Sequence, residues 1–280
     1  LCALSFLNFS CTEESRKHVV GAGAVVAIIS LSRHKSLVTQ RRCAAALCNV
    51  TSYEAGMQRM VGDGIIPALV NLVVSEDVET VRYACAAICR MCSTVENGKL
   101  ILESGAIPNI VCGAKEGDLQ TMITCCAVLS SLSFYESCRI KLCEFGIISA
   151  LKSLSELNDE STKERCLAAF ANLSCEVSVQ AMMIENGVVG IIASLAQSYR
   201  EMNQICCAKA LCNLSCCEGY RLSICKEGGM ESLMMISLVR SVDIQTKLLC
   251  VYAMGNLTED ETIDFVLEEG IVSSVANLSK

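Results

Sequence analysis

The 280-residue sequence has no tryptophan, two prolines, two histidines and few aromatic residues. So few prolines exclude a proline-rich linker. The two histidines, His18 and His34, form no Ser–His–Asp set and no Cys–His pair at helical spacing, so we expect no enzyme. The longest mainly apolar stretch, residues 19–31, is interrupted by two glycines and is too short to span a bilayer. We therefore expect no catalytic centre and no membrane span.

Acidic residues outnumber basic ones, which gives a formal net charge of −7 and an isoelectric point of about 5.1. A general nucleic-acid-binding surface is basic, so this charge balance argues against nucleic acid as the partner. Hydrophobic residues make up 52% of the chain, enough for a continuous core. They are mostly aliphatic and rich in alanine, which favours packed helices.

Two markers recur at one interval along the chain. A stretch rich in alanine and cysteine, residues 42–51, returns in altered form at residues 165–174 and 206–215. Its asparagine position recurs every 41 residues, with a last interval of 43, at Asn8, Asn49, Arg90, Ser131, Asn172, Asn213 and Asn256. A glycine recurs at the same interval, with one step of 42, at Gly23, Gly64, Gly105, Gly146, Gly187, Gly229 and Gly270. Two markers with one period predict a tandem-repeat solenoid.

We interpret residues 1–280 as one repeat domain. Because the first and last repeats are incomplete, we expect the chain to be a piece of a longer protein. The expected repeats are residues 1–10 (partial), 11–51, 52–92, 93–133, 134–174, 175–215, 216–258 and 259–280 (partial).

Each repeat is expected to contain three helices. In residues 51–92, Thr51 and Glu54 have the S/T-x-x-E spacing of a capping box, which predicts the start of a short first helix. That helix ends at Gly64, since glycine adopts the left-handed conformation of a helix C-cap. A second helix follows over residues 65–74, with Pro67 in its first turn, and a third runs from about residue 78 to residue 92. The capping-box spacing occurs in six of seven units, beginning at Ser10, Thr51, Ser93, Ser133, Ser215 and Thr258.

The 21 cysteines follow the repeat. At the position six residues before the asparagine marker, cysteine alternates with alanine, so we expect small buried hydrophobic side chains there. Zinc sites built from residues 85–92 or 206–217 are disfavoured, because these cysteines fall inside predicted helices and both histidines are distant. We expect no metal and no cofactor, and a reducing compartment. The cysteines at that position are Cys2, Cys43, Cys125, Cys166, Cys207 and Cys250.

A three-helix unit of about 41 residues, with a glycine before helix two and A-x-x-A-L-x-N-[LV]-[ST] closing helix three, resembles the armadillo repeat over essentially all of the chain. HEAT repeats have a similar period but lack the short first helix and the asparagine. The resemblance implies an all-α fold: a right-handed α–α superhelix, the armadillo-repeat solenoid, with about five complete repeats. It also implies that the third helices line a concave groove.

The function implied by the resemblance is a non-catalytic protein–protein interaction module, as in catenins and importin-alpha. An extended or helical partner segment would lie in the groove, and the asparagine amides would bond its main chain. The matching residues are Asn8, Asn49, Asn172, Asn213 and Asn256. Basic residues of the third helices would favour an acidic partner; these are Arg42, Arg82, Arg90, Arg165 and Lys209.

Each of these residues also has a structural interpretation. An asparagine near a helix end can hold adjacent repeats in register, and a basic side chain can belong to a solvated helix face. Arg90 and Ser131 interrupt the asparagine column. Nuclear-import adaptors of the family place tryptophan four residues before the asparagine, and this chain has none, which argues against a nuclear-import receptor.

Two alternative functions remain. The chain could be a scaffold in a cytoskeletal or axonemal assembly that uses its convex face or edges, an interpretation favoured by the interrupted column. It could also be the interaction arm of a larger enzyme such as a ubiquitin ligase. We expect an intracellular location, in the cytoplasm with its cytoskeleton and cilium, or in the nucleus.

Overall fold

The computed structural model describes residues 1–198, 200–258, 262–264 and 267, and within these residues it contains helices and no strand. The chain divides into two compact units, Leu1–Ala150 and Leu151–Lys280, which are described separately. In the described residues no single helix is long and apolar enough to cross a bilayer. Two consecutive helices, Val177–Glu185 and Val188–Ala196, together have the length and apolar composition of a membrane span, but they meet at an angle of 84°.

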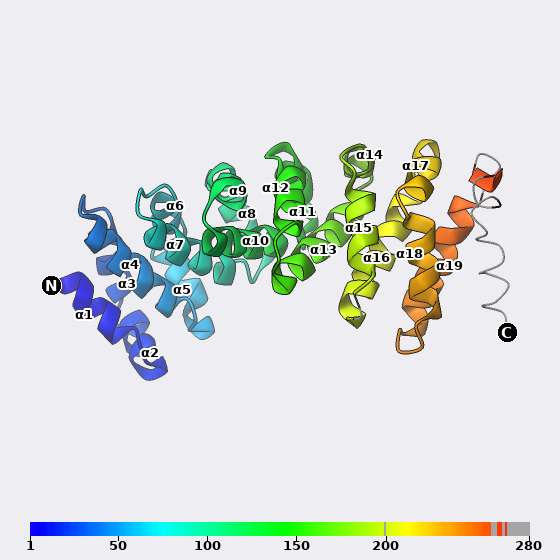
Figure 1. Cartoon of the computed structure of the whole chain (residues 1–280). Helices are drawn as coiled ribbons and strands as arrows, with labels where there is room; N and C mark the ends of the chain where they lie inside the picture. Colours follow the sequence, from blue (N-terminus) through cyan, green and yellow to red (C-terminus); the bar gives the residue numbers. More distant parts are fainter. Residues whose placement is uncertain (199, 259–261, 265–266, 268–280) are drawn as a thin grey trace. The chain divides into compact units, whose positions relative to one another are not determined.

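The first unit contains three complete repeats and parts of two more (Figure 1). The third helix of each repeat is the longest and follows two shorter ones. The elements are α1 Cys2–Phe9, α2 Glu13–Gly21, α3 Ala24–Ser32, α4 Leu37–Val50, the 3-10 turn η1 Glu54–Gly56, α5 Met57–Gly62, α6 Ile65–Val73, α7 Val78–Met91, α8 Val95–Glu103, α9 Ile107–Glu116, α10 Leu119–Ser133, α11 Glu136–Glu144 and α12 Ile147–Ser155, whose last turns belong to the second unit.

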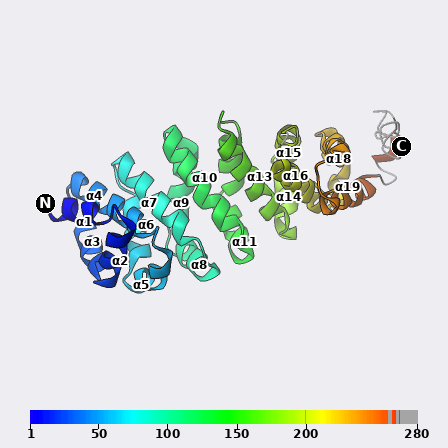
Figure 2. The same ribbon diagram turned by 90° about the horizontal axis from the view of Figure 1, so that it is seen from below.

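The second unit repeats this order of elements (Figure 2). They are α13 Glu160–Ser174, α14 Val177–Glu185, α15 Val188–Ala196, α16 Glu201–Leu214, η2 Glu218–Tyr220, α17 Arg221–Lys226, α18 Gly229–Leu238 and α19 Ile244–Leu257.

Within each unit the third helices pack side by side in chain order. In the first unit α1 packs on α4, α4 on α7 and α7 on α10; in the second, α13 packs on α16 and α16 on α19. Small side chains allow this close approach: Ala44, Cys85, Cys126 and Ala208 occupy equivalent positions of four third helices and are fully buried. The alanine- and cysteine-rich motif is therefore the packing surface between repeats.

Most of the cysteines predicted to be buried are buried, but Cys2, at the start of α1, is exposed and the prediction was wrong there. All 21 are free, and at the position six residues before the asparagine marker Cys43, Cys125, Cys166, Cys207 and Cys250 are fully buried. Burial raises the pKa of the Cys43 thiol to about 11 and that of Cys250 to about 12. These thiols are therefore neutral at physiological pH and pack as small apolar groups.

Glycines turn the chain between the first and second helices. The positive φ angles, 70° to 87°, lie in the left-handed region that glycine adopts without strain. In the repeat of residues 216–258 the glycine with positive φ is Gly228, so the predicted Gly229 was wrong. The interval from Gly187 is therefore 41 residues, as between the earlier glycines. Gly229 is instead the first residue of α18. The predicted Gly270 lies outside the described residues.

The predicted capping boxes were also wrong. The hydroxyls assigned to helix starts end the third helices instead: Ser10 Oγ donates to Leu7 O (2.7 Å), Thr51 Oγ1 to Cys48 O (2.7 Å) and Ser215 Oγ to Cys212 O (2.7 Å). The last carbonyls of a helix have no partner within it, so a hydroxyl three residues on satisfies one of them. Two first helices do have a side-chain N-cap. Thr12, two residues after Ser10, caps α2, and Thr94, one residue after Ser93, caps α8.

Four of the third helices, α7, α10, α13 and α19, begin with an Asp-x-x-Thr box. Asp77 accepts a hydrogen bond from Thr80 N (2.9 Å), and Asp159 accepts one from Thr162 N (2.8 Å). The same pattern caps α10 through Asp118 and α19 through Asp243. Each carboxylate satisfies an unpaired N–H and lies at the positive end of the helix dipole.

We predict that Asp77→Ala destabilises the protein in a pH-dependent way. Hydrogen bonds from Arg41 and then from Thr80 lower the pKa of Asp77 to about 2. A lowered pKa contributes stability above the unfolded-state value of about 3.9, and this contribution is lost as pH falls towards 2. Urea unfolding at neutral pH should show that the variant has an unfolding free energy about 1–2 kcal/mol lower than the native protein, because the helix cap is lost.

The difference between Asp77→Ala and the native protein should shrink as the pH falls from about 4 to 2. Glu76→Ala, at the exposed neighbouring position, is the control and should leave stability nearly unchanged. A loss in Asp77→Ala that stays constant over this pH range would contradict the role assigned to the carboxylate.

Candidate functional site

The asparagine column joins successive third helices. Asn49 Nδ2 donates to Ser10 Oγ, Asn213 Nδ2 to Ser174 Oγ and Asn256 Nδ2 to Ser215 Oγ, each at 3.0 Å. Each accepting hydroxyl lies at the end of the preceding third helix. The column therefore holds adjacent repeats in register, which was the structural interpretation of these residues.

These bonds leave part of each amide for a partner. A primary amide has two N–H donors and a carbonyl oxygen. Asn49, Asn213 and Asn256 are half-buried, and within the described residues their side-chain carbonyl oxygens accept no hydrogen bond. Asn8 is exposed at the end of α1, and Asn172 is half-buried near the end of α13.

The two interruptions of the column differ from each other. Arg90 Nη1 donates to Cys48 O at 2.8 Å, so this arginine joins α7 to the end of α4, as an asparagine does elsewhere. Ser131 Oγ donates to Ala127 O in its own helix (2.9 Å). Arg90 remains exposed, which leaves guanidinium N–H groups open to solvent.

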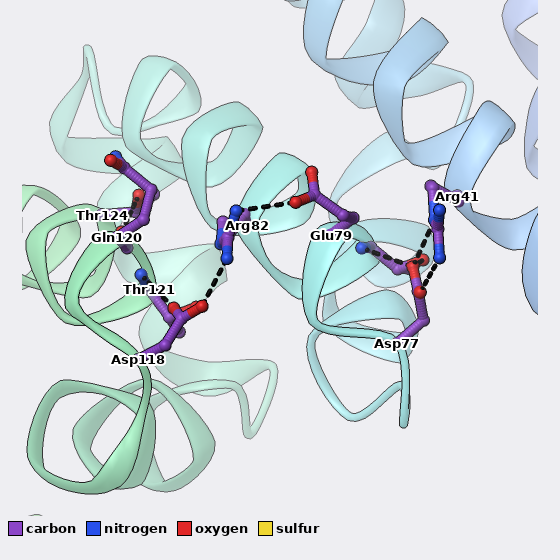
Figure 3. A network of polar contacts seen from close by, with 9 residues as sticks. Arg41, Asp77, Glu79, Arg82, Asp118, Gln120, Thr121 and Thr124 are labelled. Carbon is purple, nitrogen blue, oxygen red and sulfur yellow. Dashed lines mark hydrogen bonds and ion pairs between the residues drawn. The ribbon is translucent and has the colours of Figure 1, made fainter.

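A row of ion pairs follows the starts of the third helices in the first unit (Figure 3). Arg41 of α4 pairs with the cap Asp77 of α7, through Nε at 3.0 Å from Oδ2. Arg82 pairs with Glu79 in its own helix (2.7 Å) and with the cap Asp118 of α10. Hydrogen bonds from Thr121 and then from Arg82 lower the pKa of Asp118 to about 2.

In the second unit, Glu164 of α13 forms an ion pair with Arg200, which lies 36 residues later, just before α16. Here the acidic residue comes first in the chain, whereas in the first unit the arginine comes first. These pairs were not predicted from the sequence. The signal was present: Asp-x-x-Thr at 77, 118, 159 and 243, with an arginine 36 residues before the first two aspartates.

The predicted basic residues therefore fall into two groups. Arg82 and Arg90 bind neighbouring repeats of the protein itself. Arg42 is half-buried on α4, while Arg165 and Lys209 are exposed on the adjacent helices α13 and α16. Lys209 lies four residues before Asn213, about one helical turn away on the same face of α16.

A cleft of about 760 Å³ lies beside the asparagine column in the first unit. Its wall includes Arg90 and the apolar side chains of Met57 and Val61, and its rim carries Glu54 and Glu96. Asn97, 7% exposed, lines it, and its side-chain amide forms no hydrogen bond in the described structure. This amide is therefore available to a ligand group that can form a hydrogen bond with it.

We predict that Asn213 and Ser174 are energetically coupled. Asn213→Ala removes the 3.0 Å bond between α16 and the end of α13 and should cost about 1 kcal/mol of unfolding free energy. In a double-mutant cycle with Ser174→Ala, the coupling energy should be about 0.5–1.5 kcal/mol. Additive effects of the two substitutions would show that this bond does not join the repeats.

No group of three or more His, Cys, Asp or Glu side chains in the described part of the chain is arranged to hold a metal ion. Cys85 Sγ and Cys125 Sγ approach to 3.9 Å, but both are fully buried between adjacent third helices. This contact is one of packing between repeats.

Comparison with known proteins agrees with this geometry. Residues 58–93 match the family model of the armadillo/beta-catenin-like repeat. No curated protein matches the sequence. An engineered protein of known structure has a TM-score of 0.83 at 22% identity, over 98% of this chain and 68% of its own.

Designed armadillo repeat proteins are also similar. One has a TM-score of 0.74 at 17% identity, over 83% of this chain and 99% of its own. Another, solved in complex with the peptide (KR)4, has a TM-score of 0.67 at 20% identity, over 76% of this chain and 90% of its own. The likeness at these identities is one of fold, the armadillo-repeat solenoid.

Proposed function

Since the chain is an armadillo-repeat protein, we propose that it binds a segment of another protein along the surface of its third helices. The observation that carries this proposal is the asparagine column. Its amides are fixed by bonds to the neighbouring repeat and keep a carbonyl oxygen that can accept a hydrogen bond from a partner's main chain. Fixed groups lose little entropy on binding, which favours affinity.

The chemistry of the third helices suggests an acidic partner. Arg42, Arg165 and Lys209 lie on these helices, and Arg165 and Lys209 are exposed. One designed armadillo repeat protein is seen with the basic peptide (KR)4, whose charge is opposite to that of the partner proposed for this chain. In the first unit, the cleft lined by Arg90 and Asn97 would receive one side chain of the partner.

The test begins with peptides selected from a random phage-displayed library on the native protein. Affinities of the selected peptides are then measured by fluorescence anisotropy against single variants. Lys209→Glu should weaken binding of an acidic peptide by about tenfold, because it removes an attraction and adds a repulsion. The matched control is Lys115→Glu, an equally exposed lysine on the second helix α9.

If Lys209→Glu, Arg42→Glu and Lys115→Glu all bind every selected peptide as the native protein does, the third-helix surface is not the binding site. Circular dichroism melting curves of each variant separate loss of binding from loss of structure.

A second function, a docking platform in a cytoskeletal or axonemal assembly, is favoured by one observation. Arg82 and Arg90, which we expected to face a partner, bond neighbouring repeats instead. A platform would use the other faces of the repeats. Stoichiometric co-purification with filament proteins that survives competition by the selected peptides would support it. In both cases we propose a reducing, intracellular location, because the interior is filled with free thiols.

A further inference from the structure

A second cleft, of about 490 Å³, lies between the first helices of two adjacent repeats in the first unit. One side is the C-terminal half of α2, with Lys17 and His18, and the other is η1 and α5, with Arg59. It is formed by first helices, whereas the surface proposed above is formed by third helices.

The floor of this cleft is closely packed. Val20 is buried, and a Cβ added to Gly56 would lie 2.7 Å from Tyr53 Cδ1 and 2.8 Å from Val20 Cγ1. Only glycine at this position allows the two repeats to approach so closely. The cleft is therefore a fixed feature of the repeat interface, with an apolar floor.

Its rim is basic. Lys17, His18 and Arg59 are all exposed. The residues that line the cleft all belong to the described part of the chain, and none of them is an aspartate or a glutamate. The Glu14 carboxylate lies 4.0 Å from His18 Nε2, at the edge of the cleft. The side chains of Lys17 and Arg59 form no hydrogen bond or ion pair with the described residues. Their charges are available to a ligand.

The sequence concentrates positive charge around this cleft. Residues 1–60 carry seven Arg or Lys and three Glu, together with both histidines of the chain. The remaining residues carry 16 Arg or Lys and 27 Asp or Glu. A local positive region on an otherwise acidic protein attracts negatively charged groups of a ligand.

We propose that this cleft binds an acidic segment of a partner protein, with carboxylates at Lys17 and Arg59 and an apolar side chain on the Tyr53 floor. Arginine offers a carboxylate two parallel N–H groups, which favours this ligand at Arg59. The proposal goes beyond the third-helix surface, because it assigns a separate site on the first helices.

The probe is a short fluorescein-labelled peptide in which glutamates flank a central leucine. Binding is followed by anisotropy at low and at physiological salt, since screening weakens exposed charge contacts. The double variant Lys17→Glu with Arg59→Glu should lower the affinity by about tenfold or more. The matched control, Lys99→Glu with Lys141→Glu, makes the same charge change at exposed lysines of the first helices α8 and α11.

The control pair should change the affinity by less than about threefold, by its long-range charge alone. The proposal is overturned if both pairs weaken binding equally, because net charge would then explain the loss, or if neither does. It is also overturned if single-stranded DNA or anionic vesicles displace the peptide from the cleft more strongly than an excess of unlabelled peptide. Lys209→Glu should leave this binding intact, which separates failure here from failure at the third helices.

A photo-crosslink locates the bound peptide independently of affinity. Benzoylphenylalanine at Ala55, an exposed residue of the cleft, should crosslink to the peptide, and the same group at Lys141 should not. Crosslinking from both positions to the same extent would contradict a defined site.

Discussion

Replacing Phe170 by alanine is expected to lower the unfolding free energy by about 3–5 kcal/mol. Phe170 lies on α13 and is fully buried, the largest side chain of the described core that is completely enclosed. The truncation removes apolar contacts and leaves a cavity that packed helices fill only in part. Urea unfolding followed by circular dichroism measures the loss.

The control for this substitution is Tyr252→Ala, on α19 of the same unit. Tyr252 is 67% exposed, so loss of its ring removes few contacts. Alanine has the higher helix propensity, and the expected change is within about 0.5 kcal/mol. Equal losses for the two variants would show that the core of the second unit is not where the structure places it.

Gly229→Ala is expected to destabilise the second unit by about 1–3 kcal/mol, although alanine is the better helix former. A Cβ at Gly229 would lie 2.6 Å from Ile224 Cγ2 and 2.8 Å from the Ile224 carbonyl oxygen. Rotation of a side chain cannot relieve the second contact, because the oxygen belongs to the backbone of α17. The turn between α17 and α18 would have to open.

Gly190→Ala is the matched substitution in α15. The nearest atom to its Cβ would be Glu227 Oε2 at 3.7 Å, an ordinary contact. This variant should therefore gain about 0.5–1 kcal/mol from the better helix propensity of alanine. Thermal melting of both variants tests the pair, and a gain at Gly229 would contradict the packing of the corner.

Periodicity made the helices predictable. The third helix expected over residues 78–92 is α7, Val78–Met91, and the second helix expected over residues 65–74 is α6, Ile65–Val73. Glycine at Gly64 has the predicted positive φ. These features depend on local properties, namely turn chemistry and apolar spacing, which one sequence displays directly.

The direction of hydrogen bonds was not predictable in the same way. Ser10 and Thr51 have the spacing of a capping box, yet their hydroxyls bond backward to the preceding helix. At Ser10 the hydroxyl also accepts a hydrogen bond from Asn49 of the next repeat. That donor lies 39 residues away in sequence, so local spacing contains no sign of it.

The site was predicted in outline only. The asparagine positions were found from the period, but the partners of Arg82 and Arg90 depend on which atoms of adjacent repeats come within reach. Asn97 and the cleft it lines were not predicted, because a cleft arises from packing between repeats and has no motif. The excess of basic residues in residues 1–60 is present in the sequence. It indicates a binding site only when the structure places Lys17 and Arg59 in the lining of one cleft.

The most direct test of the account is hydrogen–deuterium exchange of the native protein with and without a selected peptide. We predict slower exchange in the third helices of at least one unit, at the segments that contain Asn49 and Arg90 or Asn172 and Asn213. The second helices, such as α6 and α15, should exchange as they do in the free protein. Peptide binding that protects the second helices and leaves every third helix unchanged would contradict the assignment of the third-helix surface as the binding site.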